Sequence, residues 1–215
     1  MSDLRETVLA AESNWLDRWT EGPTEKASAL LPPGTPTPDL ALPDQAGILR
    51  RLAEFWANGP ALVMFWRHFG CSCGMTRAER LLAELDGYRE ANLTPVIIAP
   101  GEPERTALYK AAHGIPCVML CDPDLDAYRA FGVGHWAVEQ VLFDAPPEYW
   151  AHSREVGIEF QDRRRREGRP PVDDPWRAAA EFVVGANGLI RLAYAYQHCE
   201  DYPDPRVLTT AGRLS

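Results

Sequence analysis

Two closely spaced cysteines are the residues of this chain best suited to chemistry. Cys71 and Cys73 follow a short apolar stretch, residues 61–66, and a break at Gly70. The residues after them have helical spacing, so we expect both thiols where a strand ends and a helix begins. The free N–H groups and the dipole of a helix N-terminus favour a thiolate. The spacing therefore predicts a redox-active cysteine pair.

The neighbouring residues suggest separate roles for the two thiols. Cys71 comes first after the turn, so it is the better placed of the two to be ionised. Arg67 and His68 stand four and three residues upstream, and either adds positive potential if the turn folds it back. Cys73 can attack an oxidised Cys71 without domain motion, and a Cys-X-Cys disulfide should be comparatively easy to reduce again.

Arg177 is a further candidate for the site. It lies just before a predicted hairpin, where its guanidinium could reach the thiolate. It could equally pair with Asp173 or Asp174. The sequence does not decide between these two interpretations.

The other three cysteines have less distinctive surroundings. Cys117, Cys121 and Cys199 are most simply read as small buried hydrophobic residues. On one strand, Cys117 and Cys121 would lie about 13 Å apart and could not bond to each other. Either could still approach Cys71 from a neighbouring strand. The sequence thus leaves open whether Cys73 or one of these three resolves an oxidised Cys71.

A metal site is the main alternative chemistry. Zinc or an iron–sulfur cluster would find enough soft ligands in Cys71, Cys73, Cys117, Cys121 and the segment 198–200. The spacings do not form paired knuckles, and a strand cannot turn two alternate thiols onto one ion. A Cys–His hydrolase would need one of the histidines at 113, 135, 152 or 198, none of which sits in a local signature. We therefore expect neither a metal nor a cofactor.

Alternating strands and helices must position the cysteine turn. The pattern predicts three strands, over 61–66, 94–99 and 115–121. A helix is predicted after each strand: one over 75–88, one that starts at 101–104 and one that ends at Phe131. Short links between them imply parallel pairing with right-handed crossovers. Asn187-Gly188 then predicts a hairpin between 182–186 and 189–196. The result is an α/β fold with a mixed sheet and helices on both faces.

Further elements precede this core and interrupt it. The N-terminal ones are a helix over 2–20, an extended proline-rich linker over 32–38, a short edge strand over 40–42 and a helix over 48–56. Before the hairpin we place an insertion over 135–176, with a strand over 138–143 and a helix over 149–166. This divides the chain into an N-terminal extension, 1–38, and one domain, 39–215.

Composition limits the partners and the compartment. The 215 residues carry a net charge of -9, which argues against nucleic acid and anionic membranes as partners. No apolar run approaches the length of a membrane span, and the charged N-terminus lacks a secretory h-region. An odd count of five cysteines is not typical of a disulfide framework. These features predict a cytoplasmic protein.

Several segments together resemble a known family. They are 65–71 (Phe-Trp-Arg-His-Phe-Gly-Cys), 115–116, 120–124, 128–132, 181–184 and 187–194. With these segments in this order, the chain resembles the peroxiredoxin-like members of the alkyl hydroperoxide reductase/thiol-specific antioxidant family, within the thioredoxin-like superfamily. The resemblance runs from about Pro38 to Leu208, with 135–176 as its poorest match.

The resemblance implies a fold, an activity and partners. The fold would be a thioredoxin-like three-layer α/β/α sandwich, with the N-terminal helix and the insertion as additions. Cys71 would be the peroxidatic residue, attacking a peroxide O–O bond and becoming a sulfenic acid. An external thiol reductant, thioredoxin-like or of low molecular weight, would restore it. Many relatives dimerise, so a homodimer is also consistent with the resemblance.

The turn itself differs from the usual family pattern. Members typically carry Thr or Ser three residues before the peroxidatic cysteine, where this chain has His68. Members with a Cys-X-X-Cys pair would place the second thiol at Gly74 rather than Cys73, and the family arginine falls at Ala179, two residues from Arg177. We therefore predict a hydroperoxide reductase that uses Cys71 and Cys73. The alternatives are a thiol–disulfide oxidoreductase without peroxidase activity and a non-enzymatic redox-sensing or metal-binding module.

Overall fold

The computed structural model describes residues 2–142 and 173–214, with 146–147, 155, 158–159, 162–163 and 165–166 between them. Its centre is a five-stranded sheet in the order β5-β4-β3-β6-β7. The strands are β3 (Ala61–Phe65), β4 (Thr94–Ala99), β5 (Val118–Cys121), β6 (Ala180–Val184) and β7 (Ile190–Ala195). β3, β4 and β5 are parallel, whereas β6 is antiparallel to β3 and to β7. The predicted mixed sheet is confirmed.

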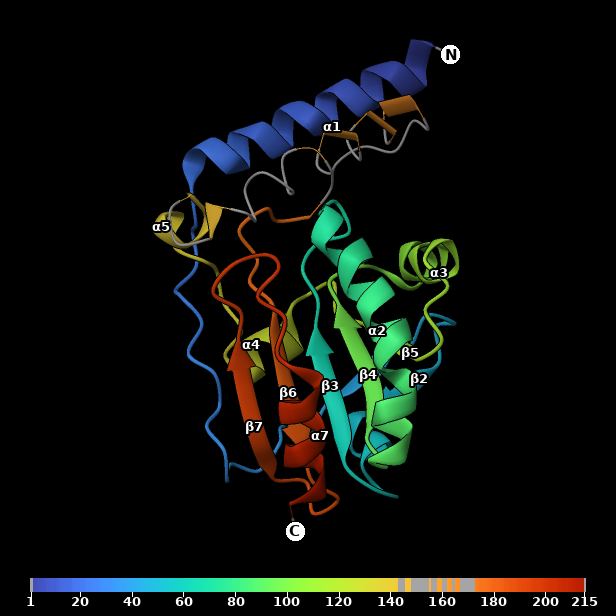
Figure 1. The fold of residues 1–215 in the computed structure, drawn as a ribbon. Coiled ribbons are helices and arrows are strands. Elements are labelled where there is room, and N and C mark those ends of the chain that lie inside the picture. Colours follow the sequence, from blue (N-terminus) through green and yellow to red (C-terminus); the bar gives the residue numbers. More distant parts are fainter. Residues whose placement is uncertain are drawn as a thin grey trace.

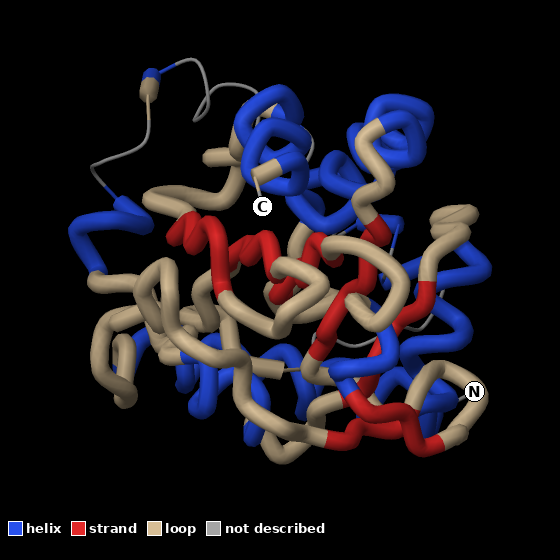
Figure 2. Tube along the Cα trace, turned by 90° about the horizontal axis from the view of Figure 1, so that it is seen from below, coloured by secondary structure: helices blue, strands red, loops and turns tan. Residues whose placement is uncertain are grey.

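Helices cover both faces of this sheet (Figures 1 and 2). They are α2 (Ser72–Glu90), α3 (Pro103–Ala112) and α7 (Pro205–Arg213) on one face and α4 (Asp126–Phe131) on the other. Alternate residues of β3 enter the two cores: Leu62 and Met64 pack against α2, while Val63 and Phe65 pack toward α4. This is the expected three-layer α/β/α sandwich. The sequence had not indicated α7.

Local side-chain chemistry explains where the core elements begin. The Asp122 carboxylate accepts the backbone N–H groups of residues 126, 127 and 128, so it caps α4. Gly188 has φ of +74° in the turn between β6 and β7, which glycine adopts at little cost. The predicted hairpin at Asn187-Gly188 is therefore confirmed.

The N-terminal segment lies against the core. Helix α1 (Ser2–Glu21) confirms the predicted N-terminal helix, and it crosses the end of the molecule toward which β3 and β4 point (Figure 1). The linker after it hydrogen-bonds to the domain, with the Ala29 N–H donating to Gly132 at 2.8 Å and the Gly34 N–H to Ile190 at 2.7 Å. The proline-rich linker is thus docked, but it contains a turn at residues 33–34 and is not extended throughout.

Two secondary-structure predictions were wrong. Residues 48–56 do not form one helix: β2 (Leu49–Arg51) pairs with β1 (Ala41–Pro43), and a single 3-10 turn, η1 (Leu52–Phe55), follows. The Asp44 carboxylate accepts the N–H groups of residues 46 and 48 and so fixes a turn before β2.

The second error lies at the start of the insertion. Residues 138–142 form a short helix, α5 (Val138–Leu142), instead of a strand. Most of the helix expected over 149–166 lies outside the described residues, and the insertion and the division at residue 38 stay predictions. None of the described helices is long and apolar enough to cross a membrane.

We predict that Gly132→Ala lowers the free energy of unfolding by about 2–4 kcal/mol. Gly132 has φ of +75°, and a Cβ there would collide with the carbonyl oxygen of Ala29 in the docked linker. Gly47 is the matched control because it has φ of +78° with nothing within 4 Å of the added Cβ. Gly47→Ala should cost only about 1 kcal/mol in urea denaturation. Equal losses in the two variants would contradict the docking of the linker.

Candidate active site

The cysteine turn lies where β3 hands over to α2. Cys71 is the N-cap of α2, and its sulfur accepts the Cys73 N–H at 3.4 Å. The structure joins Cys71 and Cys73 in a disulfide, with Cα atoms 5.3 Å apart. Cys71 is half-buried and Cys73 is buried. The predicted strand-to-helix position is therefore found, and the two thiols are within bonding reach of each other.

The Arg67 guanidinium is the cation that contacts the sulfur atoms among the described residues. Its Nη1 lies 3.2 Å from Cys71 Sγ, 3.9 Å from Cys73 Sγ and 2.8 Å from Cys199 Sγ. Arg67 is only 8 % exposed. No carboxylate of the described residues lies within ion-pair distance of it. A buried cation of this kind calls for an anion, and a thiolate is the anion the neighbouring residues can supply.

Backbone carbonyls and one aromatic ring hold Arg67 in place. Its Nε donates to the carbonyl oxygen of Arg177 at 2.8 Å, and its Nη2 donates to the carbonyl oxygen of Pro175. The guanidinium carbon lies 4.4 Å from the centre of the Trp136 ring. Two of the three guanidinium nitrogens are therefore occupied by the protein, which leaves Nη1 for the sulfur atoms.

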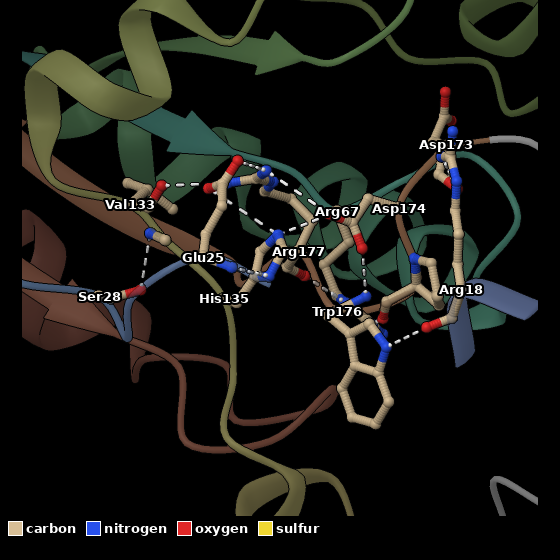
Figure 3. A network of polar contacts seen from close by, with 12 residues as sticks. Arg18, Glu25, Ser28, Arg67, Val133, His135, Asp173, Asp174, Trp176 and Arg177 are labelled. Atoms are coloured by element: carbon tan, nitrogen blue, oxygen red, sulfur yellow. Dashed lines mark hydrogen bonds and ion pairs between the residues drawn. The ribbon is translucent and has the colours of Figure 1, made fainter. Parts of the chain in front are cut away.

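The Arg177 side chain does not reach the cysteines. Its guanidinium pairs with the Glu25 carboxylate at 2.7 and 2.9 Å and lies 3.7 Å from Asp174 (Figure 3). Its main partner is thus Glu25, which the sequence had not suggested, and Asp174, one of the two acids that it had suggested, is more distant. Arg177 contributes to the site through its backbone carbonyl, which positions Arg67.

A ring of polar contacts supports the loop that carries these carbonyls. His135 Nε2 lies 2.5 Å from the Asp174 carboxylate, and His135 Nδ1 accepts the backbone N–H of Glu25 at 3.1 Å (Figure 3). The hydrogen bond from Arg177 lowers the pKa of Glu25. Burial alone would raise the pKa of Asp174, but the His135 contact and nearby cations bring it below its usual value. The N-terminal segment thereby helps to fix the loop behind Arg67.

His68 is buried, but it faces the N-terminal helix. Its ring centre lies 6.3 Å from that of Trp15, which stacks on Trp19, which in turn stacks on Trp176 at 4.6 Å. The backbone carbonyl of His68 accepts the Cys71 N–H at 3.3 Å. The part expected for the His68 ring in stabilising a thiolate stays a prediction.

Cys199, which the sequence left open as one of three alternative resolving thiols, lies beside the cysteine pair. The sulfur atoms of Cys71, Cys73 and Cys199 all lie within 4.8 Å of one another. The topology explains why: β3 and β7 are both antiparallel to β6, so they run in the same direction and end at the same edge of the sheet. The hairpin prediction therefore contained this signal, because Cys199 follows the second hairpin strand.

Cys117 and Cys121 are not part of this sulfur cluster. Cys117 is half-buried and packs against the core formed with α2, while Cys121 is fully buried on β5. Burial raises the pKa of the Cys117 thiol to about 11 and also raises that of Cys121. Both are therefore neutral thiols at neutral pH and unsuited to nucleophilic attack.

A small cavity adjoins the cluster. It has a volume of about 20 Å³, room for about one water-sized molecule, and Cys73, Cys199 and Arg67 line it together with aromatic rings. Behind it lies a buried ion pair between Arg77 and Glu181 at 2.9 Å, and the Tyr196 hydroxyl donates to the same carboxylate. Polar side chains and rings thus enclose a space beside the disulfide.

The three sulfur atoms do not form a ready metal site. Zinc binds thiolates, and two of these sulfurs are joined in a disulfide. The Arg67 guanidinium, 2.8 Å from the third sulfur, would repel a cation in the middle of the cluster. The ligand set considered from the sequence also included Cys117 and Cys121, which lie elsewhere.

We expect Arg67→Met to slow alkylation of reduced Cys71 by iodoacetamide by up to about tenfold at neutral pH. Losing about 1.4 kcal/mol of thiolate stabilisation lowers the thiolate fraction by that factor when the thiol form predominates, and by less when the thiolate predominates. Peptide mass spectrometry of a reduced, native sample gives the rate. Arg206→Met, at an exposed arginine on α7, is the control and should leave the rate unchanged. An unchanged rate in Arg67→Met would contradict the assigned interaction.

The Glu25–Arg177 pair should make stability depend on pH. The pKa of Glu25 is lower in the folded protein than in the unfolded chain. Ionised Glu25 therefore stabilises the folded protein at pH values above the unfolded pKa, and this stabilisation is lost as the pH falls through the folded pKa. Glu25→Gln should therefore be less stable than wild type at neutral pH, and the difference should shrink in acid. Urea midpoints measured across this range test this. Glu79→Gln, an exposed site on α2, should show no such dependence.

Comparison with known proteins agrees with this architecture. The family model described as the AhpC/TSA family matches residues 33–192. A protein provisionally named a peroxiredoxin, from two strains of Mycobacterium tuberculosis, is 30% identical over 103 residues, which are 47% of this chain and 64% of that protein. The match thus spans less than two thirds of those relatives.

Solved structures share the fold at low sequence identity. The peroxidoxin BcpB of Mycobacterium tuberculosis has a TM-score of 0.56 at 17% identity, over 86% of this chain and 97% of that chain. A thiol peroxidase from Chromobacterium violaceum also has a TM-score of 0.56, at 15% identity over 86% and 87% of the two chains. The family match covers well over half of the sequence, and so the chain belongs to the AhpC/TSA family.

Proposed function

We propose that the protein is a thiol peroxidase in which Cys71 reduces hydroperoxides. The observation that best supports this is the Nη1 of a buried arginine, Arg67, 3.2 Å from a cysteine sulfur at a helix N-cap. Both the guanidinium and the helix dipole stabilise a thiolate there. Membership of the AhpC/TSA family and the likeness in fold to peroxiredoxins support the same chemistry.

The reaction then follows from the positions of the two thiols. The Cys71 thiolate attacks one oxygen of the peroxide, the O–O bond breaks, and the second oxygen leaves as hydroxide or alkoxide and takes up a proton. Cys71 becomes a sulfenic acid. The Cys73 sulfur attacks the Cys71 sulfur, the hydroxyl of the sulfenic acid leaves as water, and the Cys71–Cys73 disulfide forms, which is the bond seen in the structure.

An external thiol completes the cycle. Reduction of the disulfide needs two electrons, which a thioredoxin-like protein or a low-molecular-weight thiol would supply. Cys71 is half-buried and so remains reachable for such a reductant, whereas Cys73 is buried. The homodimer and a cytoplasmic location, both expected from the sequence, stay predictions.

A thiol–disulfide oxidoreductase without peroxidase activity is the second candidate. His68 stands where family members typically carry a hydroxyl side chain, and its ring faces Trp15. A disulfide substrate would need the same cysteine pair and Arg67 but no hydroxyl for the peroxide. The two functions are separated by the substrate that is turned over.

The proposal predicts that reduced wild-type protein consumes hydrogen peroxide or cumene hydroperoxide and that Cys71→Ser abolishes this. Intact mass after mild oxidation should show the loss of two hydrogen atoms, and Cys73→Ser should instead accumulate a Cys71 sulfenic acid. Cys117→Ser is the matched control, because its thiol lies outside the sulfur cluster. If the wild type turns over disulfides but no peroxide, the second candidate replaces the first. Turnover of neither, in a folded protein, would contradict both.

A further inference from the structure

We propose that Cys199 is a third redox-active residue, which attacks the Cys71–Cys73 disulfide at Cys73 and releases Cys71 as a thiolate. This rests on the function proposed above and extends it. The exchange would free the peroxidatic cysteine while the protein is still oxidised. The two oxidising equivalents would then be held in a Cys73–Cys199 disulfide.

Distance and charge favour Cys199 as the attacking group. Its sulfur lies within 4.8 Å of both disulfide sulfurs. Arg67 Nη1 is 2.8 Å from Cys199 Sγ, closer than to either of the other two sulfurs. Because a disulfide carries no charge, the guanidinium in the oxidised protein can stabilise a thiolate at Cys199. The thiolate is the form that attacks a disulfide.

The leaving group decides which sulfur is attacked. Cys71 Sγ lies at the N-cap of α2, accepts the Cys73 N–H at 3.4 Å and is 3.2 Å from Arg67 Nη1, whereas Cys73 Sγ is 3.9 Å from that nitrogen. Cys71 is thus the better stabilised thiolate and the better leaving group. Attack at Cys73 therefore expels Cys71, whereas attack at Cys71 would expel Cys73, which is the less stabilised thiolate.

The step balances without another reactant. One S–S bond forms between Cys199 and Cys73, and one S–S bond breaks between Cys73 and Cys71. One thiolate is present before and one after, so no electron or proton leaves the protein. Arg67 faces both the attacking and the departing thiolate, which keeps its buried positive charge balanced throughout.

The chain around Cys199 can make the small movement that is needed. Residues 197–204 form neither helix nor strand, and the sulfur must move by less than about 3 Å to reach bonding distance. The Tyr202 hydroxyl donates to the Cys73 carbonyl oxygen at 2.9 Å and so keeps this loop against the cysteine turn. Cys199 is half-buried, so an external thiol could approach the new disulfide from its side.

Trapping by dimedone in the absence of reductant tests the exchange. Reduced wild-type protein receives excess hydrogen peroxide and dimedone, which labels sulfenic acids, and peptide mass spectrometry then maps the bonds. We expect a Cys73–Cys199 disulfide together with a dimedone label on Cys71, because the freed Cys71 reacts with a second peroxide. Cys199→Ser should retain the Cys71–Cys73 disulfide and lose at least tenfold of the label. Cys117→Ser should behave as the wild type.

The bond map of the wild type decides the proposal even if a variant fails to fold. A Cys71–Cys73 disulfide as the only product, or a Cys71–Cys199 disulfide in place of Cys73–Cys199, overturns it. A second arm replaces hydrogen peroxide with diamide, which forms disulfides without a sulfenic acid. A Cys71–Cys73 bond that forms first with diamide and is then replaced by a Cys73–Cys199 bond, without oxidation of Cys71 by peroxide, would support the exchange and contradict the peroxidase function.

Discussion

The contact between the Arg67 guanidinium and the cysteine sulfurs is the interaction on which the site depends. Arg67 is a buried cation with no carboxylate of the described residues within ion-pair distance, which is costly, and a thiolate beside it would offset that cost. One nitrogen, Nη1, faces three sulfur atoms within 3.9 Å. Whichever of the three is ionised therefore meets the same charge. This makes the cluster suited to chemistry in which a negative charge moves from one sulfur to another.

Segments that are distant in sequence together hold Arg67 in position. The carbonyls of Pro175 and Arg177 hold two of its nitrogens, and the Arg177 guanidinium pairs with Glu25 from the N-terminal linker. His135 joins Asp174 to the same linker. The linker and the loop before β6 thus form one support behind the cation. A substitution at Glu25, which does not contact the cysteines, should therefore affect them by shifting the loop that positions Arg67.

Packing explains why the second thiol stands at residue 73. In relatives with a Cys-X-X-Cys pair the second cysteine would fall at Gly74. A Cβ at that position would lie 2.5 Å from the Tyr109 hydroxyl oxygen, so a side chain there would require the Tyr109 ring on α3 to shift. Cys73 instead projects beside the small cavity that Cys199 also lines. The shift by one residue therefore brings the second thiol toward the third.

The sequence by itself determined the five-stranded sheet, the helices α2, α3 and α4 on its two faces and the Cys71–Cys73 turn, because hydrophobic period, capping by Asp122 and the Asn187-Gly188 turn act over short distances. It identified Arg67, whose spacing from Cys71 is also local. It left open the partner of Arg177 and the choice among Cys117, Cys121 and Cys199 as a further resolving thiol, since the positions of these side chains depend on which strands pair. It misjudged 48–56 because a helical spacing of apolar residues also fits a short strand followed by a 3-10 turn. Only the tertiary structure, by ending β3 and β7 at one edge of the sheet, gathered three sulfurs around one guanidinium.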